Sequence, residues 1–143
     1  MLLPETAIID LARNPHADVV VCLDDEPEIL SALRREFRYE PFDVLTTVSP
    51  DQALQWIETF DVGVVLSDQR MPEMQGTDFL VEVRRRSPLT RRVMLTGFPW
   101  STLREPEAIE GIQGLVCKPW GADSLRKMVR RLLRERGQDG RSA

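Results

Sequence analysis

The sequence contains little histidine and little cysteine, and each scarcity excludes a class of site. The single histidine, His16, has no cluster of possible ligands around it, which argues against a zinc site and against histidine-based catalysis. The two cysteines, Cys22 and Cys117, both lie inside apolar runs. We therefore expect them to be small core residues, and not a disulfide or a metal-binding pair.

Long apolar runs are also missing from the chain. No segment approaches the roughly 20 apolar residues that a membrane-spanning helix needs. Pro4, Glu5 and Asp10 interrupt any signal-peptide pattern at the N-terminus. The net charge of -4 gives the molecule no general attraction to nucleic acid. We expect a cytoplasmic protein that binds no membrane and makes no direct contact with nucleic acid.

The length of 143 residues and the hydrophobic share of 42% indicate one domain with a full core. We expect the domain at 18–136, after an N-terminal extension at 1–17 and before a frayed tail at 137–143. Gly137 is expected to end the last helix. Basic residues crowd this end of the chain, and the simplest interpretation is a solvated helix face. They are Arg126, Lys127, Arg130, Arg131, Arg134, Arg136 and Arg141.

Short apolar segments alternate with segments of helical periodicity. The apolar ones show little polar alternation, which is typical of strands covered on both faces. We expect strands at 18–23, 42–47, 62–67, 91–95 and 112–117. We expect helices at 27–38, 50–59, 76–86, 100–110 and 122–136. Such alternation predicts an α/β fold, a doubly wound five-stranded parallel sheet with helices on both faces.

Two of the helices carry local signals. Ser49 is placed to cap the second one, where Pro50 suits the first helical position and Gln52 supports the cap. Pro99 and Pro106 flank or interrupt the fourth, which we therefore expect to be short or irregular.

Polar residues stand where four of the five strands end. They are Asp24 and Asp25 after the first strand, Asp68 after the third, Thr96 after the fourth and Lys118 after the fifth. In parallel sheets of this kind the ligand lies beyond the carboxyl ends of the strands. The sequence therefore predicts that these five residues form one site.

The residue types at this edge suit phosphoryl chemistry with a metal. Three ionised carboxylates repel one another and need a cation, and an all-oxygen ligand set favours Mg²⁺. Lys118 is one of two lysines beside seventeen arginines, and a compact ammonium suits a phosphoryl oxygen as a point charge. An aspartate beside such charges can act as the nucleophile and carry the group as an acyl phosphate.

These residues resemble the receiver domain of bacterial two-component response regulators over roughly residues 18–136. The resemblance implies a flavodoxin-like sheet with strand order 2-1-3-4-5. The matching motifs are Leu23-Asp24-Asp25-Glu26-Pro27, Ser67-Asp68-Gln69-Arg70-Met71-Pro72-Glu73-Met74-Gln75-Gly76, Leu95-Thr96-Gly97 and Lys118-Pro119-Trp120.

The resemblance also implies roles for single residues. Asp68 is expected to be the phosphoacceptor. Thr96 is expected to hydrogen-bond the phosphoryl group and Lys118 to pair with it, after a cis Lys118-Pro119 peptide. The expected ligands of Mg²⁺ are Asp24, Asp25, Asp68 and the backbone carbonyl of Arg70.

The implied partners are a histidine kinase or a histidine phosphotransfer protein as donor, and an output partner or fused effector domain. A homodimer is compatible with the family. We expect a signalling domain and not an enzyme, with at most self-phosphorylation and self-dephosphorylation. The motif wording is similar to that of receivers fused to cyclic-di-GMP phosphodiesterase or transcription-activating domains. The chain is therefore either a stand-alone receiver or part of a longer regulator.

One position departs from the family pattern. Leu115 stands where the family often has a Tyr or Phe that changes rotamer on activation. Phe98 and Trp100 are candidates for part of that role, and packing beneath the irregular fourth helix is the alternative.

Three other interpretations account for part of this pattern. A haloacid dehalogenase-like phosphohydrolase also uses Asp, Thr, Lys and Mg²⁺, but it needs an Asp-x-Asp that Asp24-Asp25-Glu26 does not provide. A second alternative is a non-phosphorylated interaction module of receiver fold, against which the complete acidic set argues. A third is a nucleic-acid binder that uses the basic last helix, although the sequence has no aromatic platform or helix-turn-helix signal.

Overall fold

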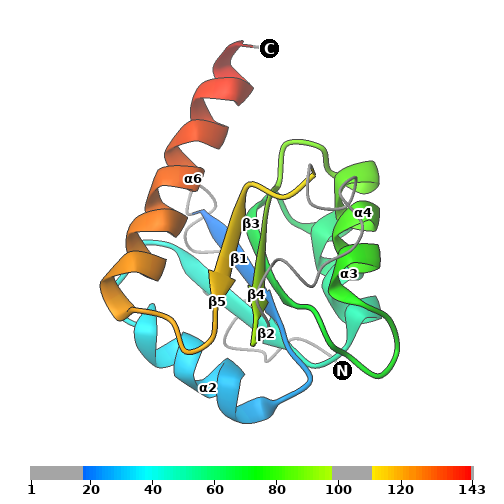
Figure 1. Cartoon of the computed structure of the whole chain (residues 1–143). Helices are drawn as coiled ribbons and strands as arrows, with labels where there is room; N and C mark the ends of the chain where they lie inside the picture. The colour runs from blue at the N-terminus through cyan, green and yellow to red at the C-terminus, as the bar shows by residue number, and fades with distance from the viewer. Residues whose placement is uncertain (1–17, 98–110, 143) are drawn as a thin grey trace.

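The computed structural model describes residues 18–97 and 111–142 and contains one parallel five-stranded sheet (Figure 1). The strand order is β2-β1-β3-β4-β5, which confirms the predicted topology. The strands are β1 (Val19–Leu23), β2 (Asp43–Thr47), β3 (Val62–Asp68), β4 (Arg91–Thr96) and β5 (Gly114–Cys117). Each lies within two residues of its predicted bounds, because the apolar runs themselves define the strands.

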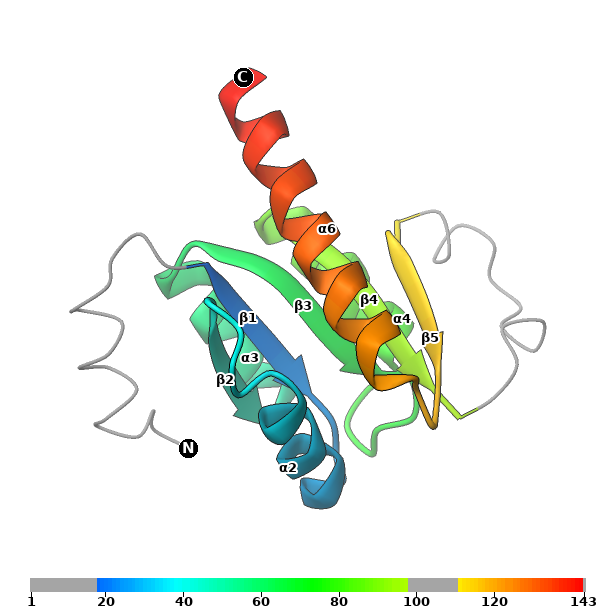
Figure 2. The ribbon, with the colours of Figure 1, turned by 90° about the vertical axis from the view of Figure 1, so that its left-hand side faces the viewer.

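The described helices cover both faces of the sheet. They are α2 (Pro27–Glu36), α3 (Pro50–Thr59), α4 (Gly76–Arg86) and α6 (Ala122–Ser142). Figure 2 shows α2 and α6 together on one face, and α3 and α4 lie on the other. The predicted extension at 1–17 and the predicted fourth helix at 100–110 fall outside the described residues.

Alternate side chains of the central strands build two cores. Val19, Val21 and Leu23 of β1 pack with α3 and α4, whereas Val20 and Cys22 pack with α2 and α6. Every residue of β1 and β3 is buried, as expected for strands covered on both faces. These apolar strands hold the carboxyl edge of the sheet in a fixed place.

The start of α3 follows its sequence signal. The Ser49 hydroxyl accepts a hydrogen bond from the Gln52 backbone N–H at 3.2 Å, and Pro50 occupies the first helical turn. A side-chain acceptor at this position satisfies one of the N–H groups that a helix start leaves without a partner. The predicted cap is therefore confirmed.

The prediction that Gly137 ends the last helix is wrong, since α6 continues to Ser142 (Figure 1). Among the described residues no glycine has a positive φ, so Gly137 does not form a left-handed helix end. Contacts on the preceding turn hold α6 instead. A Cβ at Gly63 would lie 2.5 Å from Leu133 Cδ2, and Arg136 pairs with Asp61.

The basic residues of α6 are partly committed to ion pairs with the first half of the chain. Arg126 donates to Glu36 at 2.9 Å, and Arg130 pairs with Glu40. The hydrogen bond from Arg130 holds the pKa of Glu40 below its usual range. The interpretation as a purely solvated face is therefore too simple, because these pairs join α6 to α2 and to the turn after it. Within the described part of the chain, no helix is long and apolar enough to cross a membrane.

The two cysteines differ in environment. Cys22 is buried in β1, and burial raises the pKa of its thiol to about 12. Cys117 is exposed, so its prediction as a core residue is wrong. It is the last residue of β5, the edge strand, which pairs with β4 alone. An apolar run at a sheet edge does not bury all of its side chains.

Candidate functional site

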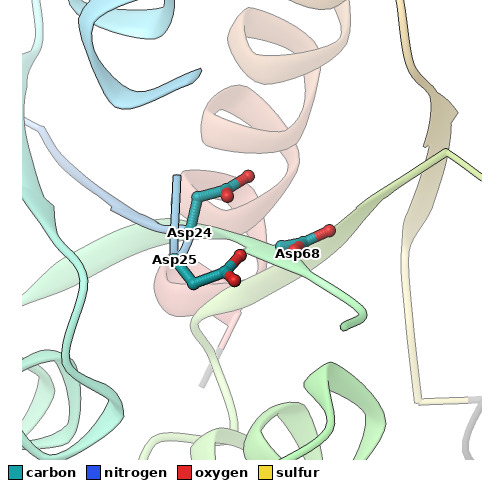
Figure 3. A group of neighbouring side chains, drawn as sticks. All are labelled: Asp24, Asp25 and Asp68. Carbon is teal, nitrogen blue, oxygen red and sulfur yellow. The ribbon is translucent and has the colours of Figure 1, made fainter. Parts of the chain in front are cut away.

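Three carboxylates meet at the carboxyl edge of the sheet (Figure 3). Asp24 and Asp25 follow β1 directly, and Asp68 is the last residue of β3. One oxygen from each lies within 4.8 Å of the others. Asp24 and Asp68 are buried, and Asp25 is the most accessible of the three. The structure thus brings together the acidic residues that the sequence predicted.

Lys118 links this acidic group to the end of β5. Its Nζ donates hydrogen bonds to Asp24 Oδ2 at 2.8 Å and to Asp68 Oδ1 at 3.1 Å. The Lys118-Pro119 peptide is cis, as predicted. The Lys118 backbone N–H donates to the Thr96 carbonyl at 2.8 Å, so the end of β4 is fixed beside it. Four strand ends therefore meet at one place.

Asp24 is more constrained than the sequence indicated. Its Oδ1 accepts from the Glu26 backbone N–H at 2.9 Å while Oδ2 accepts from Lys118. Its side chain is fully buried. Both oxygens are thus oriented by hydrogen bonds before any ligand arrives.

The charges of the site shift two of its pKa values. Burial raises the pKa of the Asp68 carboxyl, the hydrogen bond from Lys118 opposes this, and the negative charge of Asp24 adds to the rise. Burial alone would lower the pKa of Lys118. The hydrogen bonds and charges of Asp24 and Asp68 outweigh it, and the pKa of Lys118 is raised above its usual value. Lys118 is therefore a cation at neutral pH, held by two acids.

The loop between β3 and α4 forms one wall of the site. Beside the acidic group lies an open cleft lined by Asp25, Arg70, Met71, Pro72 and Gln75. The loop ends at Gly76, where only glycine fits, because a Cβ there would lie 2.2 Å from the Asp68 carbonyl oxygen. Arg70 lies on this loop. That its backbone carbonyl binds the metal stays a prediction.

The donor set fits a hard divalent cation such as Mg²⁺. All three acidic residues offer carboxylate oxygens that lie within 4.8 Å of one another, and oxygen is the ligand that Mg²⁺ takes in proteins. Lys118 alone neutralises one of the three charges. A second cation at this edge would remove the remaining repulsion.

Leu115, at the position where the family often has an aromatic residue, is partly buried in β5. It packs against the core formed with α3 and α4. The predicted role of Phe98 and Trp100 falls outside the described residues.

The match to a known family covers most of the chain. The response regulator receiver domain matches residues 20–130. The chain belongs to this family. The dehalogenase interpretation is thereby set aside, and the predicted receiver fold is confirmed.

Curated relatives and a solved structure agree with this family match. The hydrogenase transcriptional regulatory protein HoxA of Cupriavidus necator is 38% identical over 122 residues, which cover 85% of this chain and 25% of HoxA. The transcriptional regulatory protein KdpE of Mycobacterium tuberculosis is 32% identical over 79% of this chain and 51% of KdpE. A CheY-like response regulator receiver domain protein from Methanospirillum hungatei superposes with a TM-score of 0.77, at 22% identity, over 86% of this chain and 98% of that one. The chain spans about a quarter to a half of the curated relatives named here.

Asp25→Ala should stabilise the metal-free protein by about 1 kcal/mol, because it removes one of three like charges. The same change should abolish the upward shift in melting temperature on adding Mg²⁺, since a bound ligand stabilises the folded state by mass action. Thermal melts with and without Mg²⁺ measure both effects. Glu135→Ala, which removes an exposed carboxylate of α6, is the control. An unchanged Mg²⁺ shift in Asp25→Ala would contradict the metal assignment.

Proposed function

We propose that this receiver accepts a phosphoryl group on Asp68 with Mg²⁺ bound by Asp24, Asp25, Asp68 and the Arg70 carbonyl. The observation that carries the proposal is the pair of hydrogen bonds from Lys118 to Asp24 and Asp68. A lysine held beside a buried carboxylate is placed to pair with anionic oxygens that arrive on that carboxylate. The exposed Asp25 and the open cleft leave a route for the donor.

In the proposed transfer, each of these groups has one role. A carboxylate oxygen of Asp68 attacks the phosphorus of a phosphohistidine, and the P–N bond breaks as the new O–P bond forms. The imidazole keeps the electron pair and takes up a proton. Lys118 then pairs with a phosphoryl oxygen, and the Thr96 hydroxyl donates to another. Mg²⁺ supplies positive charge against the charge that develops on the phosphoryl oxygens.

The partners follow from the same proposal. The donor is a histidine kinase or a histidine phosphotransfer protein, and the receiver signals to an output partner or a fused effector domain. HoxA and KdpE are named as regulators of transcription, which favours an output of that kind. The domain itself is a signalling module whose own chemistry is limited to gaining and losing the phosphoryl group.

Acetyl phosphate with Mg²⁺ should add one phosphoryl group per chain, and EDTA should prevent the addition. Acetyl phosphate supplies a reactive phosphoryl group and so replaces the protein donor in this test. Intact-mass measurement follows the addition, and hydroxylamine should remove it, since it cleaves acyl phosphates. Catalytic release of phosphate without a stable labelled chain would instead favour a phosphohydrolase. A chain without label in Mg²⁺ would favour an interaction module without phosphorylation.

A further inference from the structure

Gln69 stabilises the loop between β3 and α4 through two hydrogen bonds, one to its backbone carbonyl and one to its side chain. Gln69 lies between Asp68 and Arg70 in the chain. Its backbone carbonyl accepts from the Gly76 N–H at 2.8 Å. Its side-chain Oε1 accepts from the Thr77 N–H at 2.9 Å. Gln69 therefore holds the first two residues of α4 from across the loop.

These two bonds replace an ordinary helix cap. The first N–H groups of a helix have no partner within the helix. Gln75 is the residue before α4, and its side chain makes no cap hydrogen bond. Gly76 and Thr77 are both buried residues, and Gln69 accepts hydrogen bonds from the N–H groups of both.

The start of α4 rests directly on the backbone of Asp68. A Cβ added at Gly76 would lie 2.2 Å from the Asp68 carbonyl oxygen and 3.0 Å from the Gln69 Cα. There is no room for a side chain between Gly76 and the Asp68 carbonyl, so the start of α4 lies directly against the end of β3. The two ends of the loop are joined, and Gln69 is the residue that joins them.

We propose that Gln69 is a positioning residue for the metal and phosphoryl site, acting through Asp68 and Arg70 on its two sides. This inference rests on the proposed function of those residues. Fixing the Gln69 carbonyl fixes the peptide plane that leads into Arg70, and Pro72 restricts Met71 from the other side. The loop then presents its metal ligands in one arrangement. Mg²⁺ demands near-ideal octahedral geometry, so a small displacement of ligands costs affinity.

Gln69→Met tests the proposal, because methionine matches glutamine in length and lacks the acceptor oxygen. Mg²⁺ should bind about tenfold more weakly, as is typical when a group that orients a metal ligand is lost. Titration calorimetry with Mg²⁺ alone measures the affinity without any phosphorylation. Amide exchange of Thr77 should become faster in the same variant. Gln55→Met makes the same change at an exposed glutamine of α3, outside the acidic site, and should bind Mg²⁺ as the wild type does.

Two further variants separate positioning from a purely structural role. Gln69→Glu keeps an acceptor oxygen and should restore both Thr77 protection and Mg²⁺ affinity at least equal to that of the wild type. Gln69→Asn shortens the side chain and should weaken Mg²⁺ binding even where Gln69→Met is too unstable to measure. A lower melting temperature with unchanged Mg²⁺ affinity in Gln69→Met or Gln69→Asn would overturn the proposal, and so would a Gln69→Glu variant that binds as weakly as Gln69→Met. Failure of the wild type itself to bind Mg²⁺ would instead overturn the proposed function.

Discussion

Asp68→Asn should abolish labelling by acetyl phosphate. The amide matches the carboxylate in size and can still accept the hydrogen bond from Lys118, so the fold of the site should persist. It lacks the anionic oxygen that attacks phosphorus. Because Asp68 lies beside two other acids, the neutral variant should also melt at a higher temperature than the wild type without metal.

The measurement is the intact mass after incubation with acetyl phosphate and Mg²⁺. Asp78→Asn is the matched control, since it makes the same change at an exposed residue in the first turn of α4. The control should label as the wild type does. Labelling of Asp68→Asn at the wild-type level would place the acceptor elsewhere, and peptide mapping would then locate it.

The sequence was sufficient for the strands and for the members of the site. The buried strand β3 begins with the apolar run Val62–Leu66, and Asp68, its last residue, is the first charged residue after that run. The carboxyl ends of parallel strands meet at one edge, so the type of residue at each end predicts which side chains come together. This explains why Asp24, Asp68 and Lys118 were placed correctly without any contact information.

What the sequence could not supply were interactions between distant segments. Lys118 lies 50 residues from Asp68 in the chain, and no local pattern specifies the hydrogen bond between them. The Gln69 contact to Thr77 spans a loop, and glutamine has no strong local signature as a cap. The sequence does carry one signal: Gln75, just before α4, is not a common capping residue, which indicates that another group must accept from the first N–H groups of the helix.

The errors have the same origin. Glycine often follows the last residue of a helix, and that local rule placed the end of α6 at Gly137. The contact of Leu133 with Gly63 and the Arg136–Asp61 pair, both between distant segments, hold the turn before it. Cys117 was assigned to the core from its apolar neighbours, although its strand is at the edge of the sheet.

Lys118→Met should destabilise the metal-free domain by about 3 kcal/mol, the cost typical of removing one partner of a buried ion pair. Asp24 is fully buried, and in this variant its carboxylate would lose the cation that now contacts it. Asp68 would lose the same partner. The variant should therefore unfold at a lower temperature or a lower denaturant concentration than the wild type.

Mg²⁺ should reverse part of this loss, because it brings positive charge to the same three acids. The rise in melting temperature on adding Mg²⁺ should thus be larger in Lys118→Met than in the wild type. Labelling by acetyl phosphate should nonetheless stay low, since the pairing of Lys118 with the phosphoryl oxygens is missing. The remaining lysine provides the matched control: Lys127→Met changes an exposed residue of α6 and should leave stability, Mg²⁺ response and labelling unchanged. Equal melting temperatures for Lys118→Met and the wild type would show that the ion pairs of Lys118 do not hold the acidic site together.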